Sequence, residues 1–159
     1  MAVYKLLDED FEHAYTLIAI HASLEDYRLA YFINSVLNLR LKRMDRRDVA
    51  SYNANVIAFE WYDEIHQVFW GLLKNKTTEK TLPSNSGLFE DNETTRTEYV
   101  VPEYNRADYL LKIDDQQGAY NATEEVVREL KKIPGIITTY TIEVQELKSK
   151  NNLIFLTNA

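Results

Sequence analysis

One short stretch near the start of the chain constrains the fold more than any other. Residues 14–21, Ala-Tyr-Thr-Leu-Ile-Ala-Ile-His, form a nearly continuous apolar run without a charged side chain. A run of this length, containing β-branched residues, predicts a strand that is buried on both faces. Such a strand lies inside a sheet, so the rest of the chain must supply its neighbours and the layers that cover it.

The segment that follows has the spacing of a helix. Between residues 24 and 37 the apolar side chains recur at intervals of three and four, which predicts an amphipathic helix. Ser23, with Asp26 three residues later, resembles an N-terminal capping box. We expect Tyr27 and Tyr31 to face the sheet from this helix, because each helix of a layered fold offers one apolar side to its sheet.

A second helix is predicted in the other half of the chain. Its expected start is Asn121, with Glu124 three residues on, and Pro134 and the glycine after it end the pattern. Val126 and Leu130 share one side of this helix. We expect that side to pack against the same sheet as the first helix.

Further strands complete an α+β fold. Alternating or β-branched runs predict strands at residues 39–44, 55–62, 65–73, 107–113, 136–144 and 153–156. Residues 75–98 are polar and predict a long loop. We therefore expect a single domain over residues 1–159, a mainly antiparallel sheet of about seven strands with two helices packed on one face.

The composition of the chain excludes several kinds of functional site. The chain has no cysteine, which excludes thiol catalysis, cysteine-ligated zinc and disulfides. Its four glycines form neither a Gly-rich dinucleotide motif nor a phosphate-binding loop. The three histidines lack metal-ligand spacing, so we expect no metal, no cofactor and no catalytic residue. Two acid–base pairs stay open for an enzyme of unrecognised type, namely His21 with Glu25 and Glu103 with Asp108.

The location of the protein is predicted from what the sequence lacks. No apolar run is long enough to span a membrane, and the first residues do not resemble a signal peptide. We therefore expect a cytoplasmic protein that does not act at a membrane.

The most basic part of the chain is the candidate contact surface. It contains five cationic residues in eight positions: Arg40, Lys42, Arg43, Arg46 and Arg47. One interpretation is an edge strand whose charges discourage pairing with other sheets. The other is a docking patch for an acidic protein, for a second copy in a homodimer, or for RNA. The net charge of −7 disfavours nucleic acid.

Residues 101–109, Val-Pro-Glu-Tyr-Asn-Arg-Ala-Asp-Tyr, are the most distinctive stretch. Pro102 indicates an edge or the entrance of a strand, because proline donates no ladder hydrogen bond. We expect Asp108 to hold a backbone or arginine partner where the next strand begins.

This stretch resembles the signature of the IPExxxVDY family, small proteins of Bacteroidota. Four positions match, Pro102, Glu103, Asp108 and Tyr109, whereas Val101 and Ala107 stand where the family has Ile and Val. Residues 23–28, 59–63 and 152–155 are also similar to the family. The resemblance implies no particular activity. We expect a non-enzymatic protein–protein interaction or adaptor module, with an RNA-associated factor and an enzyme as the alternatives.

Overall fold

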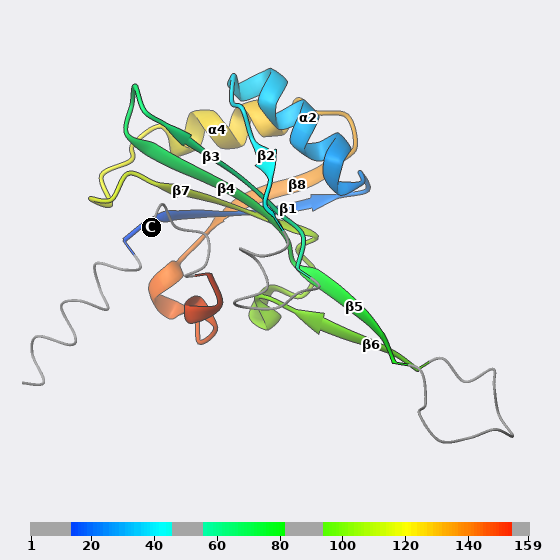
Figure 1. Ribbon diagram of the computed structural model, residues 1–159. Coiled ribbons are helices and arrows are strands. Elements are labelled where there is room, and N and C mark those ends of the chain that lie inside the picture. Colours follow the sequence, from blue (N-terminus) through cyan, green and yellow to red (C-terminus); the bar gives the residue numbers. More distant parts are fainter. Residues whose placement is uncertain (1–13, 46–55, 82–93, 154–159) are drawn as a thin grey trace, which may run out of the picture.

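The computed structural model describes residues 14–45, 56–81 and 94–153 (Figure 1). The helices and strands of these residues are β1 (Thr16–Ala22), α2 (Asp26–Leu37), β2 (Lys42–Arg43), β3 (Ala58–Asp63), β4 (Val68–Lys74), β5 (Lys76–Thr81), β6 (Thr94–Tyr99), β7 (Tyr109–Asp114), α4 (Thr123–Leu130) and β8 (Ile136–Ile142). These residues also form three short 3-10 helices: η1 (Pro102–Tyr104), which lies between β6 and β7, and η2 (Val144–Glu146) and η3 (Lys150–Leu153), which follow β8.

The α+β class is confirmed by a six-stranded sheet in the order β2-β3-β4-β7-β1-β8. Every pair of neighbouring strands in it is antiparallel. The apolar run forms β1, which lies between β7 and β8 as an interior strand. Its side chains are buried alternately in the two cores, with Ile18 and Ile20 on one face and Leu17 and Ala19 on the other.

Both helices lie on the same face of the sheet (Figure 1), as the sequence predicted. Val126 and Leu130 of α4 are buried there, but the expectation for α2 is wrong. Tyr27 and Tyr31 are 61% and 70% exposed, and the buried side of α2 consists of Leu29, Ala30 and Ile33. The helix is apolar around much of its circumference. A tyrosine keeps its hydroxyl hydrated on the outer side, whereas aliphatic side chains fill the core.

The start of α2 also differs from the prediction. Its N-cap is Glu25 rather than Ser23, and no side chain caps the helix there. The Ser23 hydroxyl instead points to the Gly135 carbonyl at 3.4 Å. The chain at the end of β1 is therefore held to the start of β8, and not to the first turn of α2.

The opposite face of the sheet is covered by the chain that follows β8. Val144, Leu147 and Leu153 are buried in the core on this side. A last strand was expected at residues 153–156, but Leu153 ends the 3-10 helix η3, and residues 154–156 lie outside the described part. Residues 144–153 thus form a layer that covers this core.

The expected polar loop at residues 75–98 requires a correction at both ends. Strands β5 and β6 pair there as a separate two-stranded sheet, which projects away from the rest of the molecule (Figure 1). Residues 82–93 lie outside the described part. Threonine recurs along both strands, and its β-branched side chain favours extended backbone even where nothing apolar marks a strand.

Candidate functional site

The basic segment lies at one edge of the main sheet. Leu39 and Leu41 are buried, whereas Arg40, Lys42 and Arg43 are exposed. The predicted alternation of residues 39–42 is thereby confirmed, and Lys42 and Arg43 form the short edge strand β2. In the β2–β3 register Lys42 lies directly opposite Glu60, and Arg43 lies opposite Phe59. Arg46 and Arg47 lie outside the described residues. We call Arg40, Lys42 and Arg43 the basic edge.

The backbone of this edge is partly occupied by a side chain from α2. The Asn34 amide nitrogen donates to the Leu41 carbonyl at 3.2 Å, and the Leu41 N–H donates to the Asn34 amide oxygen at 2.9 Å. Asn34 therefore takes the place of a neighbouring strand and limits pairing with another sheet. What the basic edge offers to a partner is its three cationic side chains.

A hollow of about 450 Å³ adjoins the basic edge on the helix side of the sheet. It lies between the end of α2 and the β3–β4 turn, and Arg40 is one of its walls. Ile65, in the turn, is 88% exposed at its rim. The lining residues are Asn38, Arg40, Trp61, Tyr62, Asp63, Glu64, Ile65 and His66. Tryptophan, tyrosine and arginine are the residues that most often dominate the binding energy of protein interfaces.

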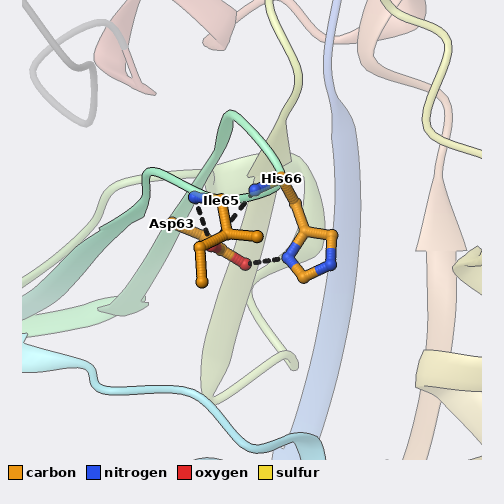
Figure 2. A network of polar contacts seen from close by, with 3 residues as sticks. All are labelled: Asp63, Ile65 and His66. Atoms are coloured by element: carbon orange, nitrogen blue, oxygen red, sulfur yellow. Dashed lines mark hydrogen bonds and ion pairs between the residues drawn. The ribbon is translucent and has the colours of Figure 1, made fainter.

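The turn at this hollow is held by a hydrogen-bonded Asp–His pair (Figure 2). The His66 Nδ1 lies 2.7 Å from the Asp63 Oδ2, and the Ile65 and His66 N–H groups donate to the Asp63 Oδ1. Burial acts to raise the pKa of Asp63, but the hydrogen bonds from His66 outweigh it and hold this pKa below its usual range. Both carboxylate oxygens thus serve the turn, which fixes Ile65 and His66 at the rim.

The distinctive stretch 101–109 is organised around one buried asparagine, which the sequence analysis missed. Asn75 follows β4 and is fully buried. Its amide nitrogen donates to the carbonyls of Tyr104 at 2.9 Å and Ala107 at 3.0 Å. Its amide oxygen accepts the N–H of Val101 at 2.8 Å. A polar residue next to a strand end carries no pattern that reveals such a role.

The side chains of the stretch hold other parts of the chain. The Glu103 carboxylate accepts hydrogen bonds from the N–H groups of Lys148 and Ser149 and from the Ser149 hydroxyl. Burial acts to raise the pKa of Glu103, but these hydrogen bonds outweigh it and lower this pKa. The Tyr109 hydroxyl donates to the Leu24 carbonyl at 2.7 Å. Val101 and Ala107 are buried in the core on the side away from the helices.

The proline of the stretch requires a correction. Pro102 does not stand at the entrance of a strand but opens the 3-10 helix η1, at its first position. Proline fits that position because its ring presets a helical φ and the missing N–H is not needed there.

The expected role of Asp108 is confirmed. Its Oδ2 accepts the Ala22 N–H at 2.9 Å, directly before β7 begins. Replacing Asp108 with alanine is expected to remove about 1–2 kcal/mol of stability, because the partly buried Ala22 N–H loses its acceptor. Thermal melting measures this loss, and Asp108→Asn, which keeps an acceptor oxygen, is the matched control. An alanine variant that melts at the wild-type midpoint would contradict this role.

Neither open acid–base pair is brought together by a hydrogen bond. The His21 Nε2 lies 2.9 Å from the Tyr140 hydroxyl, rather than next to Glu25. Glu103 holds the C-terminal segment and Asp108 holds β1. Within residues 14–45, 56–81 and 94–153, no group of three acidic or histidine side chains could hold a metal ion. No helix in these ranges is long and apolar enough to cross a membrane.

No family model, curated protein or solved structure matches this chain. The function is therefore inferred from the basic edge and its hollow alone.

Proposed function

We propose that this chain is a non-enzymatic cytoplasmic interaction module that binds an acidic protein partner through the basic edge and the hollow beside it. The observation that carries the proposal is the set of three exposed cations next to a hollow that contains Trp61 and the exposed Ile65. On a protein with a net charge of −7, such a patch concentrates attraction for acidic groups in one place.

The backbone N–H and carbonyl of Leu41 are already hydrogen-bonded to Asn34, which favours binding of a partner through side chains. Because Asn34 occupies the edge there, an added strand would have to compete with two existing hydrogen bonds. The cations, by contrast, need no rearrangement to meet carboxylates. We also propose that the chain belongs to the IPExxxVDY family. The residues that resemble its signature hold other parts of the chain and do not line the hollow.

A charge-reversal experiment tests the proposed function. Replacing Arg40, Lys42 and Arg43 with glutamate is expected to leave the melting midpoint nearly unchanged, because exposed surface substitutions usually change stability by less than about 0.5 kcal/mol. The same variant should lose the acidic protein that the wild type captures from a cell extract at physiological salt.

The matched control reverses three other exposed cations, Arg106, Arg128 and Lys131, so that the net charge changes equally. This control should retain the captured protein. Retention by the first variant would contradict the proposal. Capture of RNA that weakens steeply with salt would support the RNA-associated alternative instead.

A further inference from the structure

Lys112 is a buried amine that the proposed function does not use. It lies in the interior strand β7, next to Tyr15 and Leu153 of the core on the side away from the helices. Burial lowers the pKa of this amine to about 8, although the Asp114 carboxylate acts in the opposite direction. A buried ionisable side chain with a perturbed pKa is a candidate for a functional role when it lies beside a cavity.

Such a cavity lies beside Lys112. A second hollow, of about 490 Å³, opens at the end of the sheet where β1 begins and β8 ends. Two of its lining residues are neighbours of the amine. Leu17 is the direct cross-strand partner of Lys112, and the Tyr15 ring lies with its centre 4.1 Å from the Lys112 Nζ. Tyr15 therefore borders both the second hollow and the amine.

Tyr15 is placed so that its ring can turn aside. The residue directly precedes β1, whose pairing with β7 begins at Thr16. A change of the Tyr15 side-chain rotamer therefore breaks no hydrogen bond of this ladder. Burial raises the pKa of Tyr15, and the Asp114 carboxylate raises it further, so the phenol stays protonated at neutral pH. Tyr15 thus covers the amine as a neutral ring and does not hold it as the anion of an ion pair.

A lysine with these surroundings has the reactivity of a Schiff-base amine. At neutral pH its unprotonated fraction is on the order of a hundredfold larger than that of an exposed lysine. The lone pair of the unprotonated nitrogen attacks a carbonyl carbon, and desolvated lysines react in this way with carbonyl compounds. The carbonyl oxygen leaves as water with the two amine protons, and an imine remains. The step needs no oxidant or reductant.

The lining of the second hollow indicates which carbonyl compounds fit. Amides and hydroxyls face it from four residues: Gln117, Thr123, Thr141 and Gln145. Among the described residues that line it, only Glu143 is charged, and its carboxylate disfavours anions. Amides and hydroxyls donate hydrogen bonds to hydroxyl groups and accept hydrogen bonds from them. The second hollow therefore suits a neutral compound that carries hydroxyl groups.

We propose that Lys112 forms an imine with a small, neutral, hydroxylated aldehyde or ketone, which enters from the second hollow when the Tyr15 ring turns aside. The inference goes beyond the proposed function and is independent of it, because the basic edge and its hollow contribute no residue to this site. It also gives a reason for a buried amine in a core that aliphatic side chains could fill.

Reductive trapping of the full-length protein tests the inference. The protein is incubated at neutral pH with glyceraldehyde and sodium cyanoborohydride, which reduces an imine to a stable secondary amine, and peptide mass spectrometry locates the labelled lysines. Lys112 is expected to be labelled faster than the exposed Lys131. The Lys112→Met variant should lose this label alone. Tyr15→Ala should speed the labelling of Lys112 several-fold, because it removes the ring that covers the amine.

A variant of the second hollow tests the route of entry. Thr141→Trp places a large side chain at an exposed lining position and should slow the labelling of Lys112 several-fold. The matched control is Tyr31→Ala, on the outer side of α2, which should leave the rate unchanged. Thermal melting shows that each variant is folded. Labelling of Lys112 no faster than that of Lys131 would overturn the inference. So would a rate that Thr141→Trp does not change, since the amine would then be reached only by unfolding or by another route.

Discussion

Replacing Asn75 with alanine is expected to lower the free energy of unfolding by about 2–6 kcal/mol, because each orphaned buried polar group costs about 1–3 kcal/mol. Two backbone groups lose their partner together, the N–H of Val101 and the carbonyl of Ala107. The Tyr104 carbonyl loses one of two donors and keeps the Ala107 N–H. Water cannot replace the amide without opening the core beside it, since Asn75 is fully buried. Chemical denaturation of the purified variant measures the loss.

Two further substitutions show that the loss comes from the amide. Asn75→Asp keeps the shape and the acceptor for Val101, but it removes the donor to the two carbonyls and buries a charge. It should therefore be at least as destabilising as the alanine variant. Asn105→Ala, at an exposed position of the same stretch, should stay within about 0.5 kcal/mol of the wild type. A mild effect at Asn75 would mean that the stretch is held by its apolar contacts instead.

Replacing Lys112 with methionine is expected to stabilise the protein at neutral pH by about 2–3 kcal/mol. Lys112 lies in the interior strand β7 and is 1% exposed, with its Nζ 4.1 Å from the centre of the Tyr15 ring and 3.3 Å from the Leu153 carbonyl. Burial lowers its pKa to about 8, although the Asp114 carboxylate acts in the opposite direction. The charged form is thus less favourable in the folded state than in water, and methionine removes that cost.

The lowered pKa of Lys112 also predicts how the free energy of unfolding changes with pH. Between pH 8 and about 10.5 the unfolded chain keeps the Lys112 proton while the folded protein has released it, so the free energy of unfolding rises with pH. The advantage of the methionine variant should therefore be full below pH 8 and shrink as the pH rises through this window. Lys131→Met, at an exposed position, is the control and should show no such trend. A constant difference between Lys112→Met and the wild type would contradict the prediction.

Much of the fold was predictable because it follows from periodicity. The buried run at residues 14–21, the helix after it and the β3–β4 turn all have strong local patterns, and each is present. Tyr27 and Tyr31 were wrongly predicted to face the sheet. Helical periodicity identifies an apolar side of a helix, but α2 has two such sides, and periodicity does not show which of them is buried. The strands β5 and β6 escaped notice because their threonines and charged residues show no alternation with apolar side chains.

The candidate site was predictable only in part. The alternation of leucine and cation in residues 39–42 correctly gave the exposed side chains of the basic edge. The hollow beside it was not predictable, since it depends on where the end of α2 stops above Trp61. Asn75 acts through hydrogen bonds to backbone groups 26 to 32 residues away, and Asn34 through bonds to Leu41, seven residues on. Single asparagines leave no periodic trace in the sequence.

The position of β1 in the sheet has a consequence for synthesis on the ribosome. Both of its neighbours, β7 and β8, come from the C-terminal part of the chain, and β8 ends about 120 residues after β1 does. At ~5–20 residues per second, roughly 6–24 s pass between the emergence of β1 and the last of β8. During that time the nascent chain carries an uncharged apolar strand with no partner available. A chaperone that recognises such segments is therefore expected to meet this chain before it can fold.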